Sequence, residues 1–323
     1  MFRRPLLALA ACFTMCLGAV GPSHAASYPT KPIRLVLPYN PGGIVDYVGR
    51  VLAQYLGEKI GQPVIAENRP GAGGIAGTDA VARATPDGYT LVLMDPAIVI
   101  NPTLQPNVPY DLFKQLDPIS VVSSSPEVLV VTPALKVKTL AEFVAYGKAH
   151  PGALNFASAG IGTTPHLGGE MFKQATGIDA THIPYKGIGA SFSDMMANKV
   201  QFAFSSIAGA QPFTKDNRLT ALATTGEKRS EVYPDLPTMI EGGFKNFSVD
   251  LWLTVFAPTG LPQDIRAKLN KAINEAAADP KLKVAFAKVG VSPRGTSPEE
   301  AKAFIKTEYD KWKKVIDEGH IKN

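Results

Sequence analysis

The chain has 323 residues, a formal net charge of +5 and two cysteines, Cys12 and Cys16. A chain of this length can bury a large core and favours two domains. The small positive charge does not indicate a nucleic-acid partner. Because both cysteines precede residue 26, the rest of the chain can form no disulfide, cysteine nucleophile or cysteine metal site.

Residues 1–25 have the pattern of an export signal. Arg3 and Arg4 precede an apolar run over residues 6–20, and Ser23-His24-Ala25 fits the rule for signal cleavage. We therefore expect cleavage after Ala25 and a mature protein that resides in the periplasm. Later apolar runs fall short of the roughly 18 residues that a membrane-spanning helix needs.

From residue 33 onward, strand-like and helix-like segments alternate, which predicts an α/β fold with mostly parallel sheets. The predicted strands cover residues 34–37, 63–67, 89–94, 128–132, 154–157, 181–183, 201–204, 219–224 and 252–256. The predicted helices cover residues 45–60, 74–84, 140–149, 165–176, 190–198, 262–278, 281–289 and 298–318. A small-residue connector at residues 123–126 and a second break near residues 242–247 predict a discontinuous first domain, 26–125 with 248–323, and a second domain, 126–247.

Two glycine turns, each between an apolar strand and a helix, are the clearest functional signal. The first contains Pro41-Gly42-Gly43, and the second contains Gly160-Ile161-Gly162-Thr163. The first N–H groups of a helix have no internal partner and lie at the positive end of its dipole. Each turn is therefore a candidate anion site, and two such turns facing each other could hold a carboxylate from both sides.

Polar side chains near the turns have two interpretations each. Asp46 could fix the shape of the first turn or act as a first-turn acid that the dipole favours. Thr163 could cap the following helix or donate to a ligand, and Ser158 ends a strand where α/β sheets usually place ligand groups. His166 and Glu170 have the i,i+4 spacing of metal ligands, but no third ligand is evident, so we expect no metal.

Residues 71–76 match the G-x-G-x-x-[GA] dinucleotide fingerprint, with Asp95 about 20 residues on. This pattern is the basis of an alternative function, an exported or nucleotide-dependent enzyme. Against it, Arg69-Pro70 separates the strand from the glycines, and the fingerprint follows the second strand rather than the first. We therefore favour a glycine loop that begins a closely packed helix, with no cofactor. Trp252 could wall a ligand cleft at the second domain crossover or lie in the core.

The chain resembles the extracytoplasmic solute receptors of tripartite tricarboxylate transporters, the Bug family. The resemblance runs nearly end to end and rests on motifs in the family's order: Tyr28-Pro29-x-Lys31-Pro32-Ile33-Arg34, Pro38-Tyr39-x-Pro41-Gly42-Gly43-x-x-Asp46, Glu67-Asn68-Arg69-Pro70-Gly71-Ala72-Gly73-Gly74, Pro86-Asp87-Gly88-Tyr89-Thr90-Leu91, Gly160-x-Gly162-Thr163-x-x-His166-Leu167, Ile183-Pro184-Tyr185-Lys186-Gly187, Pro234-Asp235-Leu236-Pro237-Thr238 and Ala257-Pro258-Thr259-Gly260-Leu261-Pro262.

The resemblance implies a type II periplasmic binding protein fold with a ligand cleft between two α/β domains. It implies a non-enzymatic receptor that captures a small organic carboxylate and delivers it to a membrane permease, although the sequence does not separate uptake from sensing. We expect a monomer. The implied binding residues lie in the two turns: Tyr39, Gly42, Gly43, Asp46, Ser158, Gly160, Gly162, Thr163 and His166.

Some positions depart from the family's usual residues and concern the ligand. Tyr39 replaces the common Phe, Asn40 adds a possible donor, and Ile161 replaces a polar residue. Asp95 follows a strand where relatives often carry small hydroxyl residues, and it would repel a second carboxylate unless protonated or paired. A tricarboxylate is thereby disfavoured, and a monocarboxylate, a dicarboxylate, an aromatic acid and an amino acid remain open.

Overall fold

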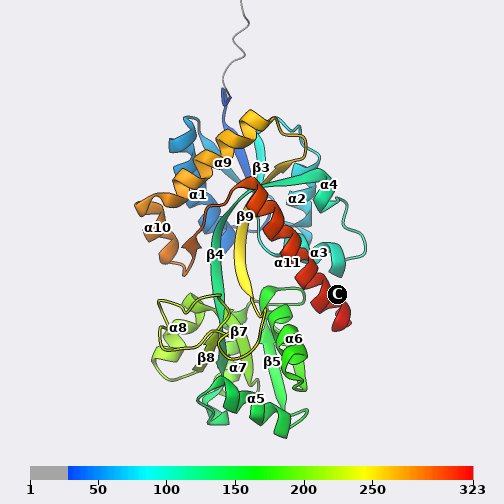
Figure 1. Cartoon of the computed structure of the whole chain (residues 1–323), viewed down its shortest axis with the longest axis vertical. Helices are drawn as coiled ribbons and strands as arrows, with labels where there is room; N and C mark the ends of the chain where they lie inside the picture. Colours follow the sequence, from blue (N-terminus) through cyan, green and yellow to red (C-terminus); the bar gives the residue numbers. More distant parts are fainter. Residues whose placement is uncertain (1–27, 323) are drawn as a thin grey trace, which may run out of the picture.

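The computed structural model describes residues 28–322, and the predicted export signal lies outside that range. The chain forms two lobes joined by two long strands, β4 (Leu116–Val131) and β9 (Asp250–Pro258) (Figure 1). No helix within the described range is long and apolar enough to cross a membrane.

The first lobe is built from the N-terminal and C-terminal parts of the described chain. Its other strands are β1 (Ile33–Leu37), β2 (Val64–Asn68), β3 (Thr90–Met94) and β10 (Ser292–Pro293). Its helices are α1 (Ile44–Ile60), α2 (Ile75–Ala82), α3 (Ala97–Leu104), α4 (Leu112–Gln115), α9 (Gln263–Ala278), α10 (Pro280–Ala287) and α11 (Pro298–Glu318), with a 3-10 turn, Ala72–Gly74.

The second lobe is built from the middle of the chain. Its strands are β5 (Leu154–Ser158), β6 (Ala180–Pro184), β7 (Phe202–Ser206) and β8 (Thr220–Thr224). Its helices are α5 (Leu140–Ala149), α6 (Thr164–Thr176), α7 (Phe192–Met196) and α8 (Ile207–Lys215), with 3-10 turns at Pro133–Leu135 and Ile188–Ser191.

The strands run in the order β2-β1-β3-β9-β4-β7-β5-β6, and β8 and β10 also pair with β4. In each lobe a βαβ unit is parallel: β1 pairs with β2 and β3, and β5 pairs with β6 and β7. The first part of β4 pairs antiparallel with β9 as far as Pro126 and Asp250, and from Glu127 onward it pairs with β7 and β8. The lobes therefore meet at Pro126, Glu127 and Asp250, and we call this place the crossover.

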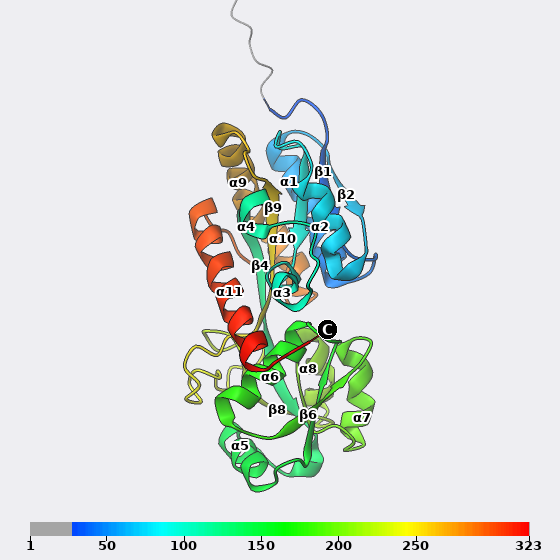
Figure 2. The same ribbon diagram turned by 90° about the vertical axis from the view of Figure 1, so that its right-hand side faces the viewer.

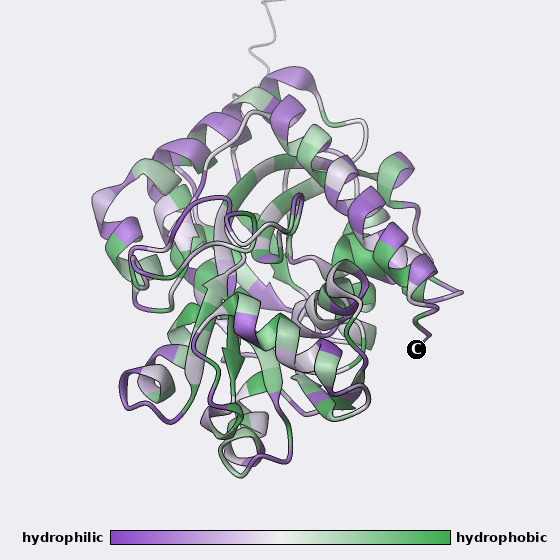
Figure 3. Ribbon diagram, turned by 60° about the horizontal axis from the view of Figure 1, so that its bottom comes forward, coloured by the Kyte–Doolittle hydropathy of each residue, from purple (hydrophilic) through white to green (hydrophobic). Residues whose placement is uncertain are grey.

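Apolar residues cover both faces of the sheets and the inner faces of the helices (Figure 3). Helix α1 buries Val48, Leu52 and Leu56 on one stripe and ends at Gly61, whose φ of 80° suits glycine. Helix α11 begins with the predicted capping box of Ser297 and Glu300 and buries Trp312, which confirms that it packs on the body of the protein. Figure 2 shows α11 running from the first lobe to α6 of the second.

One expectation about local structure is wrong, and two helices were missed. Residues 123–126 are not a connector, because they lie in the middle of the continuous strand β4. Helices α3 and α8 were not predicted, because each contains a proline, Pro102 or Pro212, and proline normally ends a helix. Helix α3 is also apolar on nearly every side, so it shows no periodic stripe. The domain boundaries at 125/126 and 247/248 lie beside the crossover and stay a prediction.

Candidate functional site

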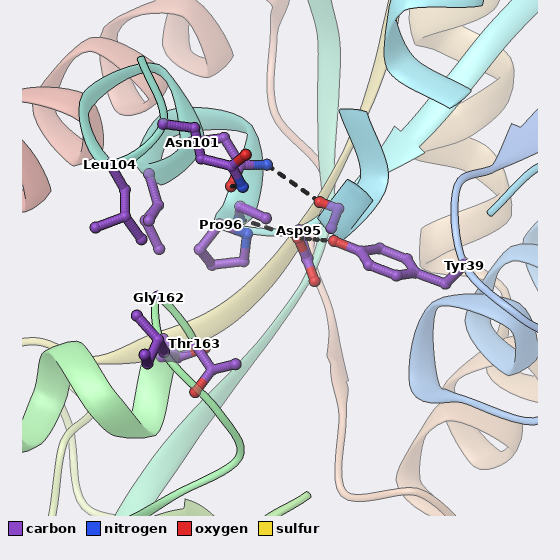
Figure 4. Close-up of a pocket in the computed structure, with 13 residues that line it drawn as sticks. Tyr39, Asp95, Pro96, Asn101, Leu104, Gly162 and Thr163 are labelled. Carbon is purple, nitrogen blue, oxygen red and sulfur yellow. Dashed lines mark hydrogen bonds between the residues drawn. The ribbon is translucent and has the colours of Figure 1, made fainter. Parts of the chain in front are cut away.

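A cavity of about 200 Å³ lies between the two lobes (Figure 4). The first lobe lines it with the end of β1, the end of β3 and helix α3, and the second lobe lines it with the second glycine turn and the start of α6. The lining residues are Tyr39, Gly73, Asp95, Pro96, Ala97, Ile100, Asn101, Leu104, Gln105, Ile161, Gly162, Thr163 and Thr164.

The second glycine turn presents the start of α6 to this cavity. The N-cap residue Thr163 makes no side-chain cap to the N–H groups of α6 in the described structure, since its hydroxyl donates to the carbonyl of Gly160 at 2.7 Å. Helix α6 has 13 residues, so its N-terminal dipole is well developed. Thr163 and Thr164 therefore lie at an uncapped, positive helix end that faces the cavity.

The first glycine turn is occupied by its own side chain. The N–H of Gly42 donates to Oδ2 of Asp46 at 3.0 Å, while Arg50 and Asn68 each donate to Oδ1 at 2.9 Å. Burial opposes ionisation of Asp46, but these hydrogen bonds outweigh it and lower the pKa of the carboxyl. The structural interpretation of Asp46 therefore accounts for both of its oxygens.

The two turns do not face the cavity equally. Tyr39 lines it, but Asn40, Gly42 and Gly43 are not among its lining residues. The cavity is therefore lined by one glycine turn, from the second lobe, opposite β3 and α3 of the first. The grip of a ligand by both turns, with Asn40, Gly42 and Gly43 contributing, stays a prediction.

Behind the second turn lies a cluster of two histidines and a serine. The N–H of Gly162 donates to Nδ1 of His166 at 3.1 Å, and the His166 ring stacks on that of His182 with centroids 3.9 Å apart. Nε2 of His182 is 2.6 Å from Oγ of Ser158, which also accepts the N–H of Gly160 at 3.0 Å. This network holds the turn in place from its buried side.

Both histidines are neutral at pH 7. Burial, the neighbouring His182 and Lys173 lower the pKa of His166 to about 3, and burial and Lys173 lower the pKa of His182 to about 4. Ser158, at 0% exposed, and His166, at 4% exposed, support the turn rather than line the cavity. Glu170 pairs with Lys173, and residues 28–322 contain no cluster of three or more potential metal ligands.

Asp95 lies at the end of β3, as its position after a strand predicted, and lines the cavity. Its Oδ1 accepts the hydroxyl of Tyr39 at 2.8 Å and the N–H of Ala97 at 3.0 Å. Burial raises the pKa of Asp95, although both hydrogen bonds oppose the shift. The hydroxyl that distinguishes Tyr39 from phenylalanine is thus used to orient Asp95.

Helix α3 supplies a wall that sequence reasoning missed, because the helix itself was not predicted. Ile100 and Leu104 give this wall an apolar surface, and Asn101 and Gln105 give it polar groups. The Asn101 side-chain amide donates to the carbonyl of Gly73 at 3.1 Å, which ties α3 to the glycine-rich loop. The glycine-rich loop therefore helps to hold α3 in place.

Trp252 does not reach the cavity. It is fully buried in the core and donates from Nε1 to Oε2 of Glu308 at 2.8 Å, and Trp312 donates to the same oxygen at 3.1 Å. Between the two interpretations of Trp252, the structure favours the core residue. It supports the contact between β9 and α11.

We expect Trp252→Phe to lower the free energy of unfolding by roughly 1–3 kcal/mol, because it leaves a gap and removes a partner of the buried Glu308 carboxyl. Ligand affinity should stay within about twofold, because Trp252 lies in the core and does not line the cavity. Urea unfolding and ligand titration of the same variant measure the two effects. A large loss of affinity with unchanged stability would show instead that Trp252 contacts the ligand.

Two α/β lobes joined by crossover strands, with a cavity between them, define a two-domain periplasmic binding protein fold. Residues 48–321 match the family model described as "Tripartite tricarboxylate transporter family receptor". The chain is 37% identical over 319 residues to Protein BugT of Bordetella pertussis, covering 98% of each chain. The chain belongs to this family of periplasmic solute receptors, which are not enzymes.

Solved structures show the same fold. The structure "R. palustris Rpa4515 with adipate" is 30% identical with a TM-score of 0.76, covering 91% of this chain and 99% of that one. "MatC (Rpa3494) from Rhodopseudomonas palustris with bound malate" is 28% identical with a TM-score of 0.71, covering 90% of this chain and all of the other. These similarities confirm the family resemblance and the fold, and they argue against the nucleotide-dependent enzyme.

Proposed function

We propose that this protein is a periplasmic receptor that captures a small organic carboxylate between its two lobes and delivers it to a tripartite tricarboxylate-type membrane permease. The observation that carries the proposal is the uncapped start of α6 at the cavity, beside Thr163 and Thr164. Backbone N–H groups and the helix dipole attract an anion there without a charged side chain. The adipate and malate in the two solved relatives are carboxylates, which supports the same ligand chemistry here.

Capture proceeds by closure of the lobes around the ligand. The carboxylate binds the second lobe at α6, and the rest of the molecule contacts β3 and α3 of the first lobe. A ligand that touches both lobes favours the closed arrangement by the contacts that only this arrangement provides. The bending element is the pair β4 and β9, which joins the lobes at the crossover.

A thermal-shift screen tests the proposal. The mature chain from Ala26 is unfolded and refolded to remove any ligand from the host, and then screened against monocarboxylates, dicarboxylates, aromatic acids, amino acids and nucleotides. A ligand that binds only the folded state raises the midpoint by mass action. We expect a rise with one class of carboxylate. A rise with a dinucleotide and with no acid would overturn the proposal.

A further inference from the structure

The cavity has an unusual charge for a site that receives an anion. Of the thirteen described residues that line it, Asp95 alone has a charged side chain. No lysine, arginine or histidine within that described lining offsets it. A carboxylate placed beside the ionised form of Asp95 would therefore meet a like charge in a partly desolvated space.

The two sides of the cavity differ in electrostatic character. On the second lobe, the start of α6 carries positive partial charge, and His166 behind it is neutral. On the first lobe, the start of α1 already holds the Asp46 carboxylate, and β3 adds Asp95. The cavity therefore attracts an anionic group at its second-lobe side and a cationic group at its first-lobe side.

The geometry of Asp95 leaves one oxygen for a ligand. Both hydrogen bonds from Tyr39 and Ala97 go to Oδ1. Figure 4 shows the Asp95 side chain projecting from the Tyr39 side toward the space above Thr163. A ligand amine in that space can donate to Oδ2 while the Tyr39 hydroxyl keeps the carboxylate oriented.

The remaining lining is mostly apolar. Ile100 and Leu104 of α3 form one wall, and Ile161, which is 46% exposed, lies at the rim of the second-lobe turn. Such a surface suits the hydrocarbon part of a small molecule.

We propose that the ligand is a monocarboxylate that also carries an ammonium group, with its carboxylate at the start of α6 and its ammonium group on Asp95. This inference rests on the proposed function, because it assigns the carboxylate to the same helix end. It commits to an amino-acid-type ligand rather than a dicarboxylate.

The test compares matched ligands by titration calorimetry on refolded protein. The probes are α- and ω-amino acids of up to six carbons, each with its monocarboxylate lacking the amine and with the dicarboxylate of the same length. We expect the best amino acid to bind at least about tenfold more tightly than both matched compounds, because charge-assisted hydrogen bonds are the strong ones. This comparison uses only the wild-type chain, so it does not depend on the folding of any variant.

Asp95→Asn keeps Oδ1 as an acceptor for Tyr39 and Ala97 but removes the charge. We expect it to weaken the best amino acid by about tenfold or more and to leave the amine-free monocarboxylate within about threefold. The control is Asp310→Asn, which removes a charge on the exposed face of α11 and should change neither affinity.

The outcomes separate the inference from the proposed function. Dicarboxylates that bind more tightly than every amino acid, or an amino-acid preference that survives Asp95→Asn, would overturn the inference and leave a carboxylate receptor. Failure of every carboxylate to bind ligand-free protein would overturn the proposed function and the inference together.

Discussion

Gly162→Ala is expected to weaken ligand binding by about tenfold or more, because a new methyl group blocks approach of the lobes. Gly162 lies at the tip of the second-lobe turn with φ of 76°. A Cβ atom built there lies 2.5 Å from Cδ2 of Leu104, on α3 of the first lobe. Real Cβ atoms do not approach other carbons so closely, so the Leu104 side chain must rotate, the lobes must separate or the turn must move.

Two further variants separate the steric effect from backbone strain. Gly177→Ala at the C-cap of α6 imposes a similar left-handed strain, with φ of 72°, but among residues 28–322 no atom lies within 4 Å of its Cβ. It should lower stability by about 1–2 kcal/mol and leave ligand affinity unchanged. Adding Leu104→Ala to Gly162→Ala should recover part of the lost affinity. Equal losses in Gly162→Ala and Gly177→Ala would contradict the proposed contact between lobes.

The second large effect concerns the crossover, where the buried Glu127 lies near the partly buried Asp250. Glu127 is 4% exposed, and in the described chain its Oε2 and Oδ1 of Asp250 have no hydrogen-bond partner. Burial and the nearby Asp250 raise the pKa of Glu127 well above its usual value. Burial raises the pKa of Asp250 to about 6, with Lys311 and Ser124 opposing the shift and Glu308 and Glu227 adding to it.

The sign of the pH dependence follows from these shifts. Below about pH 3 both carboxyls are protonated in the folded and unfolded chains, so they contribute no difference. Between the ordinary and the raised pKa values, the folded state binds more protons than the unfolded state. The free energy of unfolding therefore falls as pH rises through about 4 to 6 for Asp250 and continues to fall through the higher pKa of Glu127.

We expect Glu127→Gln to raise the free energy of unfolding at pH 8 by roughly 1–3 kcal/mol, and by much less at pH 4.5, because glutamine removes the buried charge. Urea unfolding at the two pH values measures the difference, and Glu275→Gln on the exposed face of α9 is the control. A stability gain that is equal at both pH values, or a loss at pH 8, would show that Glu127 is not an uncompensated buried acid.

The parts of the fold that sequence predicts are those fixed by local chemistry. The turns after β1 and β5 can be predicted because each places glycines between an apolar strand and the start of a helix. The start of α11 can be predicted from the capping box of Ser297 and Glu300. Helix α3 depends instead on burial between α11 and the glycine-rich loop, which no short pattern records. The same limit applies to residues 123–126, whose small side chains suit a long strand at a crowded crossover as well as they suit a loop.

The part of the site that the sequence predicts is likewise the part marked by local patterns. The helix starts and Asp95 could be found from their positions after strands. The division of roles between the two turns could not, because it depends on which side chain returns to the glycine N–H: a carboxylate, Asp46, in one turn and a neutral imidazole, His166, in the other. The acceptor therefore differs in charge: a carboxylate lies at the first turn and a neutral ring at the second, so an incoming anion is repelled less at the second turn.

The most direct test of a carboxylate held at α6 is a crystal structure of the refolded protein with the tightest ligand from the screen. We predict a carboxylate oxygen within hydrogen-bond distance of the backbone at Thr163 or Thr164, with the lobes closed on the cavity beside Asp95. A carboxylate bound instead at Gly42 and Gly43, or outside the space between the lobes, would contradict the assignment.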